Sequence, residues 1–231
     1  MEEKKYELTD ETREYDSHIL HRIKALRDFG DVKNGDLGGF IEKEENLSQD
    51  RDCWVYGDAK VYGNAQVYDD ARVCDFAEVS GETEVYDNAK VSDFAGVYGD
   101  ARVYENAEVF DFAQVYESAG VCGDAMVYDN ARVYEEADVY GEARVYGNVK
   151  VFNDANIHGK AKVYGNAQVC DNARVYGEAE VYGEAKIRDN VKLYGKAEVF
   201  GTSLVHGNAE ITKGKISEGR INGSEKSIEL D

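Results

Sequence analysis

The chain has 231 residues, a formal net charge of −20 and no proline. This acidic balance argues against nucleic acid as a partner, because a duplex-binding protein presents Lys and Arg over its footprint. It equally disfavours an anionic membrane surface. No apolar stretch approaches the roughly 20 residues that a membrane helix needs. No apolar run typical of a signal peptide follows the N-terminus, and the four cysteines are expected to be free thiols. These features predict a reduced, cytoplasmic protein.

Residues 1–54 lack the periodicity of the segment that follows them. Tyr6 begins a pattern that fits a short strand, and residues 18–27 are ambiguous between helix and strand. The first coil of a repeat protein would otherwise expose apolar side chains and unpaired amides. We therefore expect residues 1–54 to form an N-terminal cap, with Phe40, Ile41 and Trp54 closing the core beneath it.

Residues 55–210 consist of 26 uninterrupted hexapeptides with the consensus Val-Tyr-Gly-Asn-Ala-x. Small, charged, apolar and aromatic residues alternate in the stretch 59–62, and a period of two predicts a strand. Lys60 and Tyr62 are then expected to point outward while Ala and Val point inward. The Gly-Asn pair tolerates positive φ and turns the chain. Because the six-residue period is fixed, the segment is predicted to be a β-solenoid.

The length of one coil is indicated by the tripeptide Asp-Phe-Ala, which begins at Asp75, Asp93 and Asp111 with a spacing of 18. Three hexapeptides per coil give a triangular prism in which equivalent residues stack about 4.8 Å apart. The 26 hexapeptides would make about 8.7 coils and a rod on the order of 40 Å long. Positions three and four carry 21 of the 47 acidic residues, so the acid is expected at the corners.

The pattern of aliphatic residues at position one and Ala, Ser, Thr or Val at position five resembles the hexapeptide-repeat proteins. This resemblance covers residues 55–210 and implies an all-β, left-handed parallel β-helix. A second resemblance lies in the block Ala25–Ile41, followed by Asn46-Leu-Ser48 and Cys53-Trp-Val55. It is similar to the N-terminal block of the YdcK-like acyltransferases and of many phage and prophage proteins. In residues 211–231 the period breaks, which predicts a C-terminal cap.

The most distinctive departure from the consensus lies on one predicted corner, where like charges and phenylalanines would form adjacent columns. Phe replaces the usual Asn or Asp at position four, and Cys74 and Ser92 interrupt the preceding run of tyrosines. A cation such as Ca²⁺ could bridge the carboxylates, or a partner could pack on the phenylalanines, which we favour. Repeat duplication followed by drift is the structural alternative. We name this set the Asp–Phe corner: Asp75, Phe76, Asp93, Phe94, Asp111 and Phe112. Asp129 continues the column of carboxylates, and Ser92 is a further candidate binding residue.

Outward second positions hold 15 Tyr and three Phe, which predicts aromatic columns on all three faces. Such a column can bind sugar rings or pack against another subunit, because a long apolar stripe exceeds an ordinary surface patch. It can equally serve to stabilise the sheet through neighbouring side chains. One column is a candidate binding surface: Tyr128, Tyr146, Tyr164 and Tyr182.

His158 and His206 also occupy second positions. The resemblance implies that either could be the general base that trimeric hexapeptide acyltransferases place between subunits. Two features argue against this: no loop interrupts the repeat, and CoA phosphates favour Lys and Arg whereas the surface is strongly acidic. The spacing does not supply the three converging histidines of a zinc site.

The sequence therefore predicts a non-enzymatic β-solenoid binding or scaffold protein without a cofactor. We expect it to form a homo-oligomer, of which a trimer is one candidate, and to be of phage descent. The first alternative is an acyltransferase that uses acetyl-CoA, which rests on resemblance. The second is sequestration of a small molecule in clefts between subunits.

Overall fold

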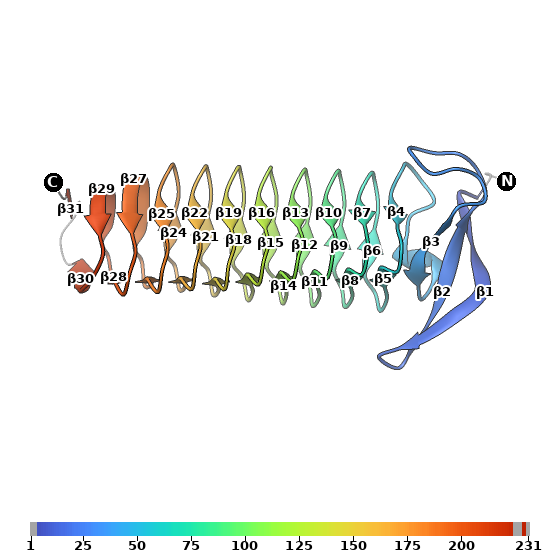
Figure 1. Ribbon diagram of the computed structural model, residues 1–231, viewed down its shortest axis with the longest axis horizontal. Helices are drawn as coiled ribbons and strands as arrows, with labels where there is room; N and C mark the ends of the chain where they lie inside the picture. The colour runs from blue at the N-terminus through green and yellow to red at the C-terminus, as the bar shows by residue number, and fades with distance from the viewer. Residues whose placement is uncertain (1–3, 224–227, 230–231) are drawn as a thin grey trace.

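The computed structural model describes residues 4–223 and 228–229, and it is a parallel β-solenoid (Figure 1). Residues 18 apart pair in register, as Lys90 does with Arg72 on one side and Glu108 on the other. The predicted all-β fold and 18-residue coil are confirmed. The left-handed winding stays a prediction that rests on the resemblance.

Three faces make up each coil, and short strands occupy them in turn. The hairpin face holds β5 (Lys60–Val61), β8 (Glu78–Val79), β11 (Gly96–Val97), β14 (Gln114–Val115), β17 (Arg132–Val133), β20 (Lys150–Val151), β23 (Gln168–Val169), β26 (Lys186–Ile187), β28 (Leu204–Gly207) and β30 (Arg220–Gly223). The tyrosine face holds β4 (Trp54–Val55), β7 (Arg72–Val73), β10 (Lys90–Val91), β13 (Glu108–Val109), β16 (Met126–Val127), β19 (Arg144–Val145), β22 (Lys162–Val163) and β25 (Glu180–Val181).

The third face holds β6 (Gln66–Val67), β9 (Glu84–Val85), β12 (Arg102–Val103), β15 (Gly120–Val121), β18 (Asp138–Val139), β21 (Asn156–Ile157) and β24 (Arg174–Val175). Longer strands end the solenoid: β27 (Lys192–Val199), β29 (Glu210–Ile216) and the short β31 (Ile228–Glu229). Because β27 pairs with both β24 and β25, it runs across two faces without a break.

The core is a thin column of Val and Ala that are fully buried along the rod. Two exceptions at position five carry hydroxyl groups, and both hydroxyls are satisfied. Thr83 Oγ1 donates to the carbonyl of Ser80 at 2.7 Å, and Ser203 Oγ donates to that of Phe200 at 2.6 Å. A buried hydroxyl without a partner would destabilise the core. In both coils the hydroxyl bonds to the carbonyl three residues earlier in the chain.

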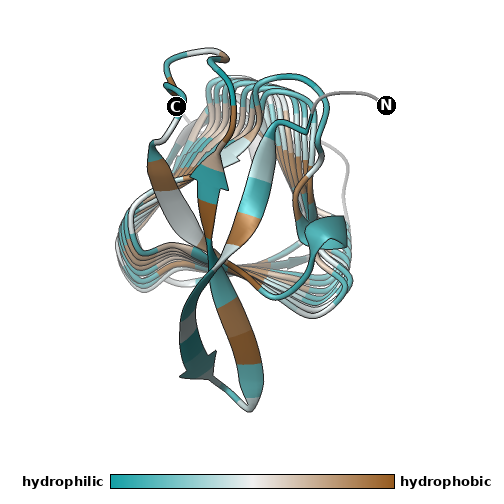
Figure 2. Ribbon diagram, turned by 90° about the vertical axis from the view of Figure 1, so that its right-hand side faces the viewer, coloured by the Kyte–Doolittle hydropathy of each residue, from teal (hydrophilic) through white to brown (hydrophobic). Residues whose placement is uncertain are grey.

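The N-terminal segment is a β-structure that continues the hairpin face. Strands β1 (Tyr6–Tyr15) and β2 (His18–Ala25) form an antiparallel hairpin, and β2 pairs with β3 (Leu37–Ile41). A short 3₁₀ helix, η1 (Glu44–Asn46), follows. The predicted short strand is thus ten residues long, and the ambiguous segment is a strand. Figure 2 shows the hairpin crossing the solenoid end and projecting beyond it.

The hairpin changes the environment of two residues expected at the surface. Lys60 and Tyr62 are only 8% exposed, because β1 and β2 cover them. Phe40 also differs from the expectation, since it packs with Leu20 and Tyr62 in this outer cluster and not over the core. Trp54 does close the core, against the rings of Tyr6 and Phe29.

Parallel pairing extends past both ends of the hexapeptide segment. At the start, β3 pairs in parallel with β5, so the ladder begins within the predicted cap of residues 1–54. At the other end, β28 pairs in parallel with β30, which lies within the predicted cap of residues 211–231. Among the described residues, no helix is long and apolar enough to cross a membrane.

The corner at Gly99 allows a direct test of the stacked geometry. An added Cβ there would lie 2.7 Å from the backbone nitrogen of Glu117 in the next coil, at a φ of +76°. We expect Gly99→Ala to lower the free energy of unfolding by about 2 kcal/mol. The matched control is Gly35→Ala, where φ is +93° but nothing lies within 4 Å. Equal losses in chemical denaturation would contradict close coil stacking.

Candidate functional site

The three phenylalanines of the Asp–Phe corner form a column at the edge between the tyrosine face and the hairpin face. Their rings stack with centroids 5.1 and 5.2 Å apart and planes within 7° of parallel. The predicted stacking is confirmed. Phe76, Phe94 and Phe112 are 49%, 56% and 58% exposed, so they present a continuous apolar ridge.

The aspartates of the same corner have a structural use that the sequence analysis did not foresee. Each carboxylate accepts a hydrogen bond from the backbone N–H of the aspartate one coil further on. The distances are 3.4 Å from Asp93 to Asp75, 3.5 Å from Asp111 to Asp93 and 3.3 Å from Asp129 to Asp111. These contacts pair amides that the turn leaves open and offset the repulsion between stacked carboxylates.

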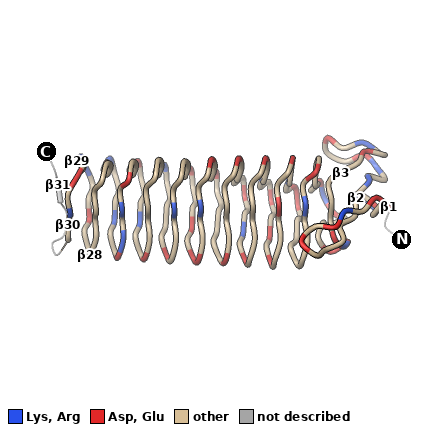
Figure 3. The backbone as a smooth tube through the Cα atoms, turned by 60° about the horizontal axis from the view of Figure 1, so that its bottom comes forward, with Lys and Arg blue, Asp and Glu red and all other residues tan. Residues whose placement is uncertain are grey.

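This arrangement recurs at other corners and accounts for the glutamates at position three. Glu105, Glu117 and Glu135 adopt φ of 57–59°, a conformation that side chains other than Gly rarely take. Glu117 accepts the N–H of Glu135 at 2.9 Å, and Glu135 accepts that of Asn153 at 2.8 Å. An acidic residue at position three is therefore a corner-stabilising group. Figure 3 shows acidic residues where the coils turn.

The proposed cation has no evident set of ligands at this corner. Within residues 4–223 and 228–229, no group of three or more His, Cys, Asp or Glu side chains is arranged to hold a metal ion. The carboxylates of Asp75, Asp93 and Asp111 are engaged with backbone amides. Ser92, a further candidate, is 4% exposed and donates to Asp93 Oδ2 at 3.4 Å. The phenylalanines are thus the exposed apolar part of the corner, beside carboxylates that remain at least partly exposed.

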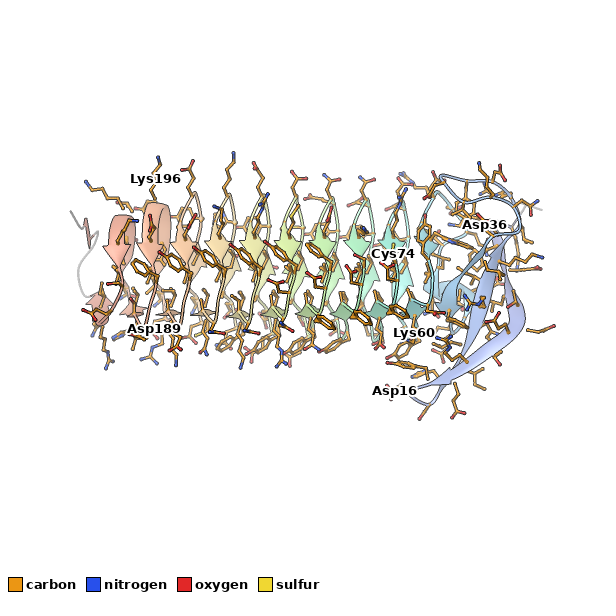
Figure 4. The ribbon with its side chains drawn as sticks, in the orientation of Figure 1. Asp16, Asp36, Lys60, Cys74, Asp189 and Lys196 are labelled. Atoms are coloured by element: carbon orange, nitrogen blue, oxygen red, sulfur yellow. The ribbon has the colours of Figure 1, made fainter. Side chains whose placement is uncertain are left out.

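A shallow hollow of about 440 Å³ lies beside the phenylalanine column on the hairpin face. It exists because Ser80 and Gly96 are small at outward positions, while the tip of the hairpin at Asp16 overhangs it (Figure 4). Tyr15 hydrogen-bonds to Glu78 and thereby fastens the hairpin, which raises the pKa of the Tyr15 hydroxyl. No local sequence pattern tells where a hairpin packs, so this side of the hollow could not be predicted from the sequence.

The tyrosine column is continuous but presents ring edges instead of ring faces. Successive rings lie 4.8–5.1 Å apart and within 6° of parallel. Sugar binding by stacking needs a free aromatic face, which such a pile leaves only at its ends. The structure therefore places these four candidates in one column that suits lateral packing or sheet stability: Tyr128, Tyr146, Tyr164 and Tyr182.

The two histidines have different surroundings. His158 lies between the rings of Tyr140 and Tyr176, at 4.7 and 4.8 Å, and burial lowers its pKa, with a smaller contribution from Arg174. His206 was expected on the surface, but it is 6% exposed. Its Nε2 accepts a hydrogen bond from Arg220 at 2.6 Å. The C-terminal strands therefore enclose His206, and only His158 faces outward.

The coil, its consensus and its columns define the molecule as a hexapeptide-repeat β-solenoid that resembles the YdcK-like proteins. Residues 119–135 and 167–183 match the family described as the YdcK β-solenoid repeat. A stretch of 61 residues is 36% identical to the "Uncharacterized acetyltransferase YdcK" of Escherichia coli (strain K12), over 23% of this chain and 19% of that protein. The chain thus matches about a fifth of the length of that relative.

Burial of the outward cysteines predicts slow thiol chemistry. It raises the pKa of Cys74 to about 11 and that of Cys170 to about 12. Because the thiolate is the reactive form, alkylation by iodoacetamide at pH 8 should be about 100-fold slower in the folded protein than in urea. Mass spectrometry against time measures this. An alkylation rate in the folded protein close to that in urea would contradict the raised pKa of these thiols.

Proposed function

We propose that the protein is a non-enzymatic β-solenoid scaffold that self-associates, and that the Asp–Phe corner is its docking surface. The observation that carries this proposal is the ridge of three half-exposed phenylalanines on an otherwise polar edge. Burying such rings releases free energy in proportion to the apolar area covered, about 25 cal/mol per Å². Stacked as they are, the three rings offer one continuous contact.

Fold stability alone gives a weaker account of these phenylalanines. Elsewhere position four carries asparagines whose amides bond from coil to coil, as between Asn148 and Asn166 at 3.0 Å or Asn106 and Asp124 at 2.9 Å. A polar ladder therefore serves the coil at this position. Exposed apolar rings in its place are typical of an interaction surface. The resemblance of the N-terminal block to phage proteins supports phage descent.

Phe94→Asp tests the proposed docking surface. Asp occupies position four in other coils, at Asp58 and Asp100 for example, so the fold should tolerate the change. We expect self-association to weaken at least about tenfold while the melting temperature moves by no more than about 2 °C. Analytical ultracentrifugation measures the first quantity and calorimetry the second.

The matched control for this test is Asn88→Asp, which adds the same charge at position four of a different corner. It should leave association unchanged. If Phe94→Asp unfolds the chain, the ring is structural. If it leaves association intact in a folded chain, the docking role is wrong.

An acetyl-CoA-dependent acyltransferase is the second candidate, and the name of the Escherichia coli relative favours it. His158 would be the base, because its lowered pKa keeps the imidazole neutral near pH 7. Arg174 lies close enough to act on it electrostatically. An active site of this kind would need a neighbouring subunit to complete a cleft around His158.

Titration with acetyl-CoA separates the two candidates. The scaffold proposal predicts neither heat on mixing nor a shift in melting temperature at millimolar ligand. Saturable binding that His158→Ala abolishes would overturn the non-enzymatic assignment. His206→Ala is a poor control, because His206 is hydrogen-bonded within the C-terminal strands.

A further inference from the structure

The C-terminal half of the hairpin face carries a column of exposed cations. Arg132, Lys150 and Lys186 are exposed and lie in one column, with Gln168 between the last two. Arg188 follows in the neighbouring column, and its Nε is buried without a hydrogen-bond partner among the described residues. We name the set of Arg132, Lys150, Lys186 and Arg188 the basic strip.

Like charges also lie in register on the other faces, as Arg72 does with Lys90 and Arg144 with Lys162. Some cations there are nevertheless paired with a carboxylate of a neighbouring coil, whereas those of the basic strip are not, within the part of the chain that the structure describes. Lys162 pairs with Glu180 at 2.9 Å, and Arg102 with Glu84 at 3.1 Å. In the strip, Arg132 is directly opposite Lys150. Like charges in register destabilise a sheet. Among the described residues, no carboxylate forms an ion pair with the strip. Its charge is therefore available to a partner.

A hollow lies between the basic strip and the edge that carries the phenylalanines. It has a volume of about 340 Å³ and is lined by Asn130, Arg132, Asn148, Val149 and Lys150. The column of Phe76, Phe94 and Phe112 continues directly into Asn130 and Asn148 on the same edge. One edge of the rod thus presents aromatic knobs and carboxylates in its N-terminal half, and a hollow beside cations in its C-terminal half.

We propose that a second copy of this chain is the partner of the Asp–Phe corner, packed antiparallel along this edge. This inference rests on the proposed self-association and names its geometry. A two-fold axis across the rod near Asn130 would bring Phe112 of each copy to the hollow of the other. Each surface is then used twice, which is the self-complementary arrangement of a symmetric dimer.

The chemistry of the two halves is complementary. A phenyl ring in the hollow lies beside the Arg132 guanidinium and the Lys150 ammonium, which attract the ring face. The same two-fold axis places the carboxylates of Asp111 and Asp129 level with Lys150 and Arg132 of the other copy, so the contact is fixed in register. Since each copy carries a net charge of −20, association depends on this local complementarity.

Two variants with reversed chemistry test the antiparallel contact. Phe112→Lys turns the knob into a cation, and position four accepts lysine at Lys160. Lys150→Glu turns the hollow acidic, and position six accepts glutamate at Glu108. Each variant alone would repeat its defect at both symmetric contacts. We expect dimerisation of each to weaken about 30-fold, measured by ultracentrifugation.

A one-to-one mixture of the two variants should restore the dimer. In the mixed pair one contact joins the new lysine to the new glutamate, and the other is the wild-type contact. Arg144→Glu, an exposed change on the tyrosine face, is the charge control and should leave the dimer intact. Circular dichroism confirms that every variant keeps the fold.

The outcomes separate this inference from the proposed function. If Phe94→Asp dissociates the protein but Lys150→Glu does not, the docking surface stands and the antiparallel partner is wrong. The antiparallel contact is also wrong if both variants dissociate but their mixture stays monomeric. Wild-type protein that is monomeric at about 100 µM, a concentration at which a dimer of 1 µM affinity would be nearly complete, overturns both.

Discussion

In-register stacking of residues 18 apart is the constraint on which the rest of the structure depends. Each coil donates its backbone amides to the carbonyls of the next, as Tyr128 does to Val145 at 3.0 Å and Asn130 to Gly147 at 3.0 Å. A strand of two residues could not persist alone. The stability of the solenoid therefore comes from repetition of the coil. A residue type that recurs every 18 positions becomes a column, and a column long enough becomes a surface.

The polar columns and the apolar ones contribute differently. Acidic side chains at position three close the corners by accepting amides from the following coil, which explains why this chain tolerates so many carboxylates there. Asparagines at position four bond to one another. Phenylalanines form no such bonds, and lysines in register with arginine gain nothing from the fold. The phenylalanines fall on one edge, and Arg132 and Lys150 lie in register beside the same edge. Together they are the reason for assigning this edge to association.

The coil, the stacked phenylalanines and the buried Val–Ala core followed from the sequence, because each depends only on a period and on residue size. The hairpin over Lys60 and Tyr62 did not, since its packing joins segments about 45 residues apart with no shared pattern. The bond from Asp129 N–H to Asp111 was equally hidden, because it depends on the corner's φ and on the carboxylate's reach. The enclosure of His206 required the C-terminal strands to be in place.

Small-angle X-ray scattering of the wild-type protein tests the central claim most directly, because it reports length and thickness separately. Lateral packing along the proposed edge predicts that the cross-sectional radius of gyration rises with protein concentration while the maximum dimension changes little. A maximum dimension that doubles at constant cross-section would show end-to-end joining. Either that result or an unchanged monomer profile would contradict the assignment of this edge as the surface on which two copies meet.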